Sequence, residues 1–335
     1  MENDTMKDKM VKIEIEKLQP QGTLDKAADL RKQDIARYID KDSGMLREDI
    51  SEHTNCMLCG KDETDLLFIK EGFRYVKCKE CGLVYVNPRI NKNKIEEFYS
   101  TGRFTFMFTN LYIPSAKYRQ EVLYNERLDF IEQYIPNGRL LDVGSAAGHF
   151  VESAMKRGWD TYGIEVGNVG ADFAKEKLNL KNIYNMTIDE AQFENDFFDV
   201  VTVWDVFEHL TEPLNTAKEI HRIIRKNGMI FVYVPNYNSV ERYICEEKCD
   251  NIVPDAHLIY YTPDTIKGLL EKAGFKIVYL ETRGIDIDHI IFNLKHYFNK
   301  KYDTKFIEEY KYILQEAFDK AYMGNWIRIF GKKEA

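Results

Sequence analysis

The sequence lacks any long hydrophobic run. No apolar stretch approaches the roughly 20 residues that a helix needs to span a bilayer, and the first ten residues, MENDTMKDKM, lack the apolar segment of a secretory leader. Both absences predict a cytoplasmic protein without a membrane span. An excess of basic residues is missing too, because 47 Lys and Arg stand against 55 Asp and Glu, a net charge of −8. Since no overall positive field attracts a polyanion, nucleic acid is disfavoured as a partner.

What the chain does contain is enough apolar material for a core. It has 335 residues, of which 44 % are hydrophobic and 30 % are charged, the balance of an ordinary globular protein. This length allows one large domain or two smaller ones. The sequence shows no internal repeat.

Four of the six cysteines form two Cys-x-x-Cys pairs, CMLC and CKEC, with eighteen residues between them. In a chain without a secretory leader this pattern indicates a metal site rather than disulfides. The spacing fits a zinc site in which Cys56, Cys59, Cys78 and Cys81 complete a tetrahedron. Because four protein ligands leave no position for water, we expect a structural ion. A rubredoxin-type iron centre and a redox-active dithiol pair are the alternatives.

Composition and pattern divide the chain into six segments. They are a charged N-terminal arm (1–50), the zinc ribbon (51–92), a helical connector (93–136), a large core (137–284), a helical insertion (285–322) and a final core strand (323–335). Within the arm, LDKAADLRKQDIARYI has the periodicity of an amphipathic helix. Apolar residues alternate in the ribbon block as they do in short antiparallel strands, so we expect a separate small module there.

From residue 139 onward, apolar strand candidates alternate with amphipathic helix candidates. The strands are RLLDVG, DTYGIEV, NIYNM, FDVVTVWD, GMIFVYVPN and FKIVYLE, and the helices are HFVESAMKRG, VGADFAKEKL, EPLNTAKEIHRIIRKNG and TPDTIKGLLEKAG. Several of the helices end at a glycine, as helices often do. Such alternation predicts an α/β fold with a mostly parallel sheet and helices on both faces.

The turn after the first of these strands, LLDVGSAAGHF, is built to approach a ligand closely. A dinucleotide fingerprint needs glycines at 144, 146 and 149, but the chain has Gly144, Ala146 and His149. It has instead Asp142 at the strand end, an acid that suits a ligand with a positive amino group and a sulfonium. A second acid, Glu165, ends the next strand, where it can accept hydrogen bonds from both hydroxyls of a ribose. One such acid alone is explained equally well as a helix cap, whereas the two together indicate a nucleoside ligand.

LLDVGSAAGHF, GIEVG, FDVVTVWDVFEHL and GMIFVYVPN resemble, in this order, the motifs of class I S-adenosylmethionine-dependent methyltransferases. The resemblance covers roughly residues 118–283, and NWIRIFGKK is similar to the antiparallel last strand of that family. It implies a Rossmann-like, doubly wound sheet that binds S-adenosylmethionine. The residues it implies at the cofactor are Asp142, Gly144, Ser145, Ala146 and Gly148 at the methionine part, Glu165 at the ribose, Thr187 and Ile188 at the adenine, and Asp205 at the sulfonium. Ala146 departs from the glycine that is usual in the family.

The stretch DVFEHL places Glu208 and His209 just past a strand end, at the same sheet edge as the cofactor turn. His209 is the candidate general base, because an imidazole with a pKa of about 6.5 is mostly neutral at working pH. Glu208 is the candidate for orienting the imidazole or the acceptor. The alternative is that this pair belongs to a helix start and contacts only backbone.

The segment HLIYYTPDTIKGLLEKAGF is similar to the corresponding part of bacterial biosynthetic methyltransferases, many of which act on sugars. The resemblance makes His257 a further candidate catalytic residue, with Tyr260 and Tyr261 beside it at the acceptor, and Tyr233 and Asn236 are weaker candidates. Packing explains each of the tyrosines equally well. Elsewhere, Cys245 and Cys249 lack a second cysteine pair, and we expect thiols that bind no metal.

Taken together, the sequence predicts a zinc-ribbon methyltransferase that uses S-adenosylmethionine and carries a structural Zn²⁺. The expected acceptor is a small polar molecule, most simply a hydroxyl or a carbon of a nucleotide-linked or glycan sugar. An RNA methyltransferase guided by the ribbon is the first alternative, and a non-catalytic cofactor-binding partner of another enzyme is the second. The helices of 285–322 suit a lid, an acceptor wall or the contact of a homodimer, and the sequence leaves these open.

Overall fold

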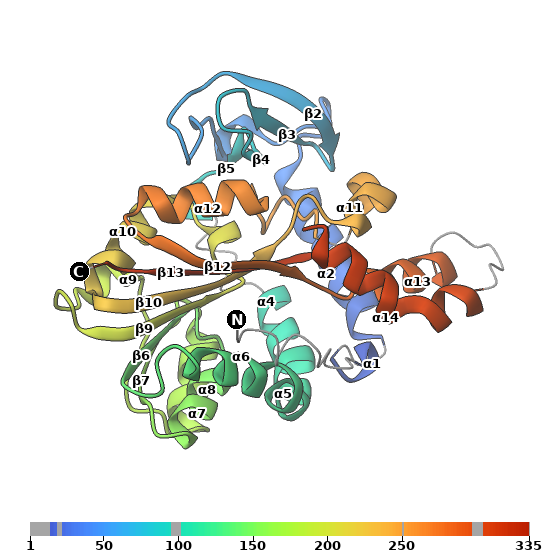
Figure 1. Cartoon of the computed structure of the whole chain (residues 1–335). Coiled ribbons are helices and arrows are strands. Elements are labelled where there is room, and N and C mark those ends of the chain that lie inside the picture. The colour runs from blue at the N-terminus through green and yellow to red at the C-terminus, as the bar shows by residue number, and fades with distance from the viewer. Residues whose placement is uncertain (1–13, 19–21, 95–101, 250, 297–303, 335) are drawn as a thin grey trace.

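The computed structural model describes residues 14–18, 22–94, 102–249, 251–296 and 304–334 (Figure 1). The N-terminal half contains α1 (Ile15–Leu18), α2 (Thr23–Tyr38), η1 (Glu48–Ile50), β1 (Ser51–Glu52), β2 (Thr64–Lys70), β3 (Phe73–Cys78), β4 (Val84–Val86), β5 (Arg89–Ile90), α4 (Gly102–Met107), η2 (Phe108–Tyr112), α5 (Ile113–Arg119), η3 (Gln120–Tyr124) and α6 (Asn125–Glu132). The segments from α4 to α6 follow one another without a break, so the expected connector helix is longer than its apolar pattern indicated.

The rest of the chain alternates strands and helices as expected. Its elements are β6 (Arg139–Val143), α7 (His149–Lys156), β7 (Asp160–Ile164), α8 (Asn168–Glu176), β8 (Ile183–Tyr184), α9 (Ile188–Ala191), β9 (Phe198–Trp204), η4 (Phe207–His209), α10 (Pro213–Ile223), β10 (Ile224–Pro235), α11 (Val240–Cys245), η5 (Glu246–Lys248), β11 (Ile259–Tyr260), α12 (Pro263–Lys272), β12 (Lys276–Arg283), α13 (Asp286–His296), α14 (Lys305–Lys320) and β13 (Trp326–Lys332). No described helix is long and apolar enough to cross a membrane.

Seven strands form the central sheet in the order β12-β13-β10-β9-β6-β7-β8. The strands from β10 to β8 run parallel to one another, while β13 lies antiparallel between β10 and β12. The chain therefore winds outward in both directions from β6, and the strand order reverses between β6 and β9. This arrangement confirms the predicted doubly wound, mostly parallel sheet with an antiparallel last strand. Sheets of this kind bind ligands at the carboxyl ends of the strands where the order reverses, which are β6 and β9 here.

Helices cover both faces of this sheet, as Figure 1 shows. On one face, α6 and α7 contribute Leu128, Ile131, Phe150 and Ala154 to a core that includes Phe231 of β10. On the other face, α10 and α12 pack into the main core, which also takes in apolar residues of the ribbon. The strands are fully buried in the middle of the sheet because both faces are covered.

The boundary between α10 and β10 differs from the prediction, which continued the helix through residue 228. The helix ends at Ile223, and Ile224 already pairs with Phe198 of β9. Ile223 and Ile224 are both fully buried, and β-branched residues fit a covered strand well. A bulge between Ile224 and Met229, where Asn227 has a φ of 65°, then accommodates the polar residues that look helical in the sequence.

The ribbon is joined to the core more closely than the sequence analysis expected of a separate small module. Its sheet has the order β11-β4-β3-β2, so it takes one strand from the chain after β10. Ile259 pairs with Tyr85 and Tyr260 with Val84, and Lys272 of α12 donates to the carbonyl oxygen of Leu58 at 3.0 Å. Figure 1 shows the ribbon strands lying over α12. The same loop that leads into β11 carries His257, which ties the ribbon to a predicted site residue.

Candidate functional site

The turn after β6 has the shape that its small residues predicted. Gly144 has a φ of 76°, and a Cβ atom there would lie 2.4 Å from Cγ2 of Val206. Gly148 has a φ of 77°, and a Cβ would lie 2.7 Å from Leu180 and 2.8 Å from Ala174. Two amides of the turn, those of Gly144 and Ser145, donate to the carbonyl oxygen of Ile164 at 2.8 Å. These hydrogen bonds hold the turn against β7.

Glu165 lies against this turn and is only 6 % exposed. Its Oε2 accepts from the amide of Ala146 at 2.8 Å and its Oε1 from the amide of Gly167 at 2.6 Å. Burial raises the pKa of this carboxyl, and the two amides oppose the shift. A carboxylate offers about four lone-pair positions, so Glu165 retains acceptor capacity for ribose hydroxyls.

Two further acids stand at the carboxyl ends of β6 and β9. Asp142 is 2 % exposed and accepts from Thr202 Oγ1 at 2.7 Å. Burial raises its pKa to about 7, and the nearby charge of Glu165 adds to the rise. Burial likewise raises the pKa of Asp205 to about 6, and its Oδ1 has no hydrogen-bond partner among the described residues. Two buried acids of this kind favour a ligand that brings positive charge.

A cation that the sequence analysis missed lies beside these acids. The guanidinium of Arg127, on α6, is 4.6 Å from the ring centroid of Trp204 and 4.8 Å from that of Tyr233. Within the described chain it makes no hydrogen bond or ion pair, although its charge lowers the pKa of Asp142 and Asp205. A lone arginine in an amphipathic helix looks like a solvated side chain, so only the fold reveals its position beside Asp142 and Asp205.

The residues expected at the adenine have other roles in this structure. Thr187 is the N-cap of α9, where its hydroxyl accepts from the amide of Glu190 at 3.4 Å while its own amide donates to that side chain at 2.8 Å. Ile188 is buried in the main core. Their backbone still lies beyond the end of β8, and their contact with an adenine stays a prediction.

Glu208, His209 and His257 form a cluster at the same sheet edge, with one ligand atom from each lying within 4.8 Å of the others. The first two belong to η4, and His257 is brought beside them by the amide of Leu258, which donates to the carbonyl oxygen of Glu208 at 2.8 Å. The two imidazole centroids are 4.9 Å apart. The sequence analysis placed all three residues at the acceptor, and the fold brings them together although Glu208 and His257 are 49 positions apart in the chain.

Burial controls the charge of this cluster. It lowers the pKa of His209, and it lowers that of His257 to about 3 with a contribution from His209. Both imidazoles are therefore neutral at pH 7. Burial, together with the charge of Asp205, raises the pKa of Glu208 well above its usual range.

Tyr261, Tyr233 and Asn236, which the sequence analysis considered for the acceptor site, make contacts within the protein. Tyr261 is buried with its hydroxyl 3.5 Å from the carbonyl oxygen of Phe207, and Tyr233 is stacked on Trp326. Asn236 donates to the carbonyl oxygens of residues 322 and 324. These contacts fit the packing alternative, and a role of these residues at the acceptor stays a prediction.

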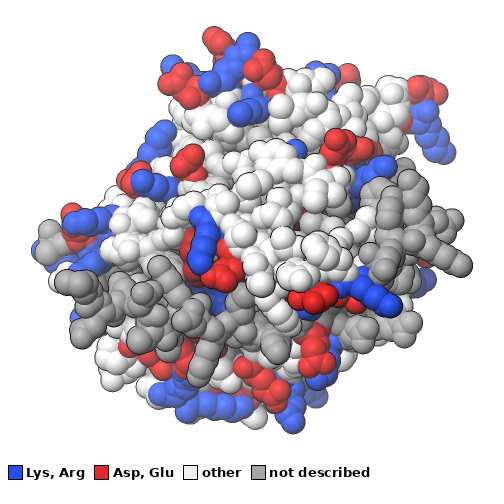
Figure 2. All heavy atoms as spheres, turned by 45° about the vertical axis from the view of Figure 1, so that its right-hand side comes forward, with Lys and Arg blue, Asp and Glu red and all other residues white. Residues whose placement is uncertain are grey.

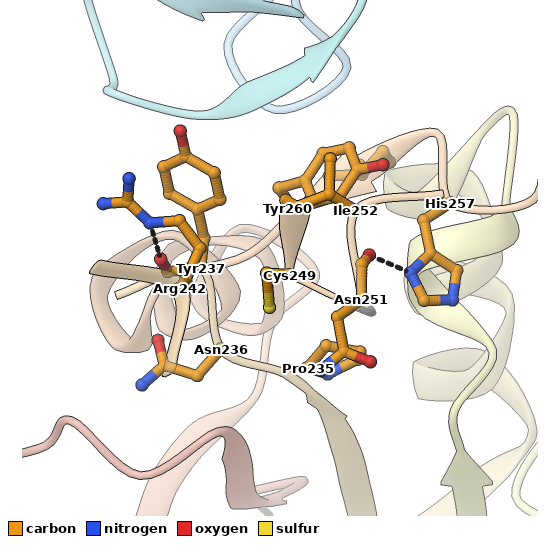
Figure 3. Close-up of a pocket in the computed structure, with 10 residues that line it drawn as sticks. Pro235, Asn236, Tyr237, Arg242, Cys249, Asn251, Ile252, His257 and Tyr260 are labelled. Carbon is orange, nitrogen blue, oxygen red and sulfur yellow. Dashed lines mark hydrogen bonds between the residues drawn. The ribbon is translucent and has the colours of Figure 1, made fainter. Parts of the chain in front are cut away.

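A small pocket opens beside His257, and Figure 3 shows its walls. Tyr237, Tyr260 and Ile252 supply apolar surface, while Arg242 lies with its guanidinium 4.5 Å from the centroid of Tyr237 and donates from Nε to that residue's carbonyl oxygen. Since His257 belongs both to this pocket and to the histidine cluster, the two features adjoin one another.

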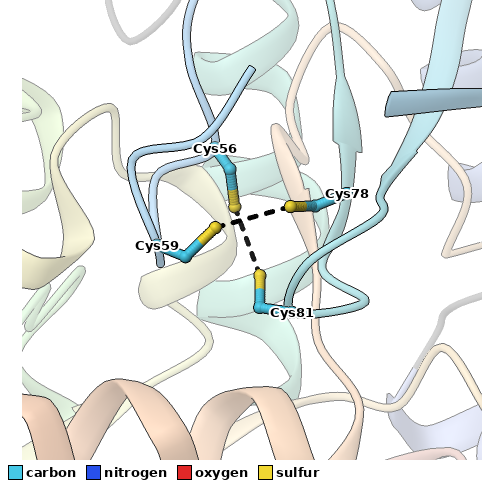
Figure 4. Close-up of side chains that lie close together, drawn as sticks. All are labelled: Cys56, Cys59, Cys78 and Cys81. Carbon is cyan, nitrogen blue, oxygen red and sulfur yellow. Dashed lines mark hydrogen bonds between the residues drawn. The ribbon is translucent and has the colours of Figure 1, made fainter. Parts of the chain in front are cut away.

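The four ribbon cysteines converge as their spacing predicted (Figure 4). Sγ of Cys56 is 3.4 Å from Sγ of Cys81, and Sγ of Cys59 is 3.4 Å from Sγ of Cys78. A tetrahedral zinc ion with Zn–S bonds of about 2.3 Å requires sulfur atoms about 3.8 Å apart, so the thiols are nearly in place.

The other two cysteines are buried thiols. Cys249 donates to Oε1 of Glu241 at 3.6 Å. Neither Cys245 nor Cys249 joins a group of described side chains able to hold a metal, and their lack of a metal stays a prediction.

A doubly wound sheet, a tight glycine turn and acids at two successive strand ends are typical of folds that bind a nucleoside at the carboxyl ends of their strands. The sequence family described as "Methyltransferase domain" matches residues 115–280. The chain is 30 % identical over 206 residues to a ubiquinone biosynthesis O-methyltransferase of Colwellia psychrerythraea, covering 54 % of this chain and 82 % of that protein. A second enzyme of the same description, from Hydrogenovibrio crunogenus, is 25 % identical over 186 residues, 49 % of this chain and 73 % of its own length.

Among solved structures, a SAM-dependent methyltransferase of Archaeoglobus fulgidus aligns with 70 % of this chain and all of its own, with a TM-score of 0.49 and 20 % identity. The chain belongs to the S-adenosylmethionine-dependent methyltransferases. The predicted class of enzyme and its cofactor are thereby confirmed, while the acceptor is not.

Proposed function

We propose that this enzyme methylates a hydroxyl group of a small ring compound held between the histidine cluster and the pocket beside His257. The observation that carries the proposal is the pair of neutral imidazoles next to the buried acids of the cofactor site. The named relatives are O-methyltransferases, which favours oxygen over carbon as the acceptor atom. They belong to ubiquinone biosynthesis and lend the sugar acceptor no support. The aromatic walls of the pocket favour a phenolic ring.

S-adenosylmethionine supplies an electrophilic methyl group on a positively charged sulfur, so the protein has only to bind, align and remove a proton. In our proposal Asp142 and Asp205 face the positive groups of the cofactor, Arg127 binds its carboxylate, and Glu165 accepts from its ribose. Ser145, Ala146 and Gly148 let the backbone approach. The raised pKa of Asp142 follows chiefly from burial, which the charge of Arg127 opposes only in part, and a bound cation would lower it further.

His209 takes the proton of the acceptor hydroxyl in this proposal. Its Nδ1 lies 2.9 Å from the carbonyl oxygen of Ala256, and because a carbonyl can only accept, Nδ1 carries the proton. The lone pair therefore resides on Nε2, on the side of Glu208 at 3.9 Å. His257 is fixed in the same way by the carbonyl oxygen of Asn251 at 2.9 Å and presents its own Nε2 to the acceptor.

The test is a methyl-transfer assay with labelled S-adenosylmethionine on matched panels of phenolic, catecholic and sugar acceptors, followed by mass spectrometry of the products. We expect O-methylated aromatic product and a loss of at least a hundredfold in kcat for His209→Ala. His221→Ala is the matched control, because the imidazole of His221 lies on α10 and packs against Phe275, outside the histidine cluster. Labelled sugar alone would overturn the acceptor class, and full turnover of His209→Ala would remove the base.

We also propose that the ribbon thiolates bind a structural zinc ion. The support is the near-tetrahedral placement of the four sulfur atoms and the position of the site in the main core. Four thiolates leave no open position for chemistry. Metal analysis of protein purified without affinity resin should give one zinc per chain, and iron in its place would favour the rubredoxin alternative.

No observation favours RNA as the substrate. On the face shown in Figure 2, acidic and basic side chains are interspersed over the described surface, and the net charge is −8. RNA recognition depends on a basic surface that tracks phosphates. Product in RNA from a labelled cell extract would nevertheless overturn the small-molecule acceptor.

A further inference from the structure

The histidine cluster contains more lone pairs than hydrogen-bond donors. Glu208 is 1 % exposed, and its Oε2 has no partner among the described residues. Its Oε1 lies 3.9 Å from Nε2 of His209. His257 adds a third ligand atom, and all three lie within 4.8 Å of one another. A buried carboxyl oxygen without a partner, beside two imidazole groups, can be satisfied by a cation bound between them.

Both imidazoles are oriented as metal-binding histidines are. Nδ1 of His209 donates to the carbonyl oxygen of Ala256, and Nδ1 of His257 donates to that of Asn251, each at 2.9 Å. A second hydrogen bond of this kind fixes the tautomer and leaves Nε2 free to bind a metal ion. Two neighbouring histidines with the same tautomer, each with a ligand atom within 4.8 Å of a carboxyl oxygen of Glu208, form a set that can bind a metal ion.

We propose that Glu208, His209 and His257 bind one divalent transition-metal ion, such as Zn²⁺, Co²⁺ or Mn²⁺. Two imidazoles and one carboxylate suit these ions, whereas Mg²⁺ and Ca²⁺ prefer oxygen ligands. Bonds of about 2.0–2.1 Å in a tetrahedral site require ligand atoms about 3.4 Å apart, so Glu208 and His209 need to approach by about half an ångström. Three protein ligands leave an open position.

This inference rests on the proposed function, because the open position is where the acceptor hydroxyl is expected. A hydroxyl on the cation becomes more acidic, its O–H bond breaks and the proton passes to solvent. The methyl group then moves from sulfur to that oxygen, the S–C bond breaks with its electron pair left on sulfur, and a neutral thioether and an ether result. His209 would then be a ligand, and the cation would replace it as the group that activates the hydroxyl.

The experiment measures cation binding directly, without cofactor or acceptor. Protein with its ribbon zinc in place is titrated with Mn²⁺, and free Mn²⁺ is followed by electron paramagnetic resonance, with Zn²⁺ as competitor. We expect one competable Mn²⁺ per chain, and affinity at least tenfold lower in His257→Ala and Glu208→Gln. His221→Ala, with its imidazole on α10, should bind as the unaltered protein does. Ribbon zinc content and circular dichroism establish that each variant is folded.

The outcomes separate this inference from the proposed function. If the unaltered chain binds neither Mn²⁺ nor Zn²⁺ beyond the ribbon ion, or if the ligand variants bind as well as it does, the site is refuted. Methyl transfer that persists after all non-ribbon metal is removed, but fails in His209→Ala, refutes the cation and retains the base. A competable cation lost in the ligand variants, in a protein that methylates no hydroxyl, supports the site and refutes the proposed function.

Discussion

We expect Asp142 to lower the free energy of unfolding at neutral pH, because its carboxyl group is buried. Burial raises its pKa from an ordinary 3.8 to about 7. The folded protein therefore holds one more proton than the unfolded chain between these values, and its stability falls as the pH rises through that window. At about 1.36 kcal/mol for each pH unit, the full cost above pH 7 is roughly 4 kcal/mol.

Asp142→Asn removes the charge and keeps an oxygen to accept from Thr202. In urea unfolding at about pH 8 without cofactor, we expect the variant to be more stable by up to ~4 kcal/mol, and at about pH 4.5 by only ~1 kcal/mol. Asp189→Asn, at an exposed position on α9, is the matched control and should differ little at either pH. A variant no more stable than the parent at pH 8 would refute the reasoning.

The same substitution should weaken cofactor binding while it stabilises the fold. An amide cannot supply the negative charge that faces the cofactor's positive groups, so we expect at least a tenfold rise in Kd, or about 1.4 kcal/mol. For the unaltered protein, affinity should fall as the pH drops below about 7, because Asp142 must lose its proton to bind a cation. Calorimetry at two pH values in buffers of different ionisation heat measures that proton.

Three further predictions concern neighbouring features. Gly144→Ala should lose at least tenfold in cofactor affinity, since its Cβ would lie 2.4 Å from Val206 Cγ2 at a positive φ; unchanged binding by calorimetry would contradict this. Arg127→Ala should raise the cofactor Kd about tenfold, whereas its affinity for adenosine, which has no carboxylate, should stay constant. Removing the ribbon zinc with a strong chelator should lower the Tm measured by calorimetry, and zinc should restore it; an unchanged Tm would make the ion dispensable.

The parts of the site that the sequence predicts are those set by short stretches of chain. The turn at 142–148 is readable because an acid, small residues and a strand end occur together, and the fold needs no distant residue to shape it. Glu208 and His209 are likewise local to the end of β9. The strand order follows from the alternating pattern, since parallel strands joined by helices have few acceptable arrangements.

What the sequence does not reveal depends on contacts between distant elements. Arg127 is one charge among many on α6 until the sheet places it between Trp204 and Tyr233. The helix α10 ends at Ile223 because Ile223 and Ile224 are buried against the sheet. This burial outweighs the helical pattern of the residues that follow. Helix and strand patterns are indistinguishable in a short run of mixed character.

The ribbon shows best how tertiary contacts complete the site. The amide of Val86, at the end of β4, donates to the carbonyl oxygen of Leu258 at 3.0 Å, and the amide of Leu258 donates to the carbonyl oxygen of Glu208 at 2.8 Å. Leu258 therefore joins the ribbon sheet on one side and η4 on the other, with His257 immediately before it. Since both hydrogen bonds fix the backbone next to that imidazole, the position of His257 depends on β4, whose preceding turn holds two of the four cysteines. In the proposed function the ribbon therefore supports the acceptor site, and loss of the proposed zinc ion should disturb acceptor binding sooner than cofactor binding.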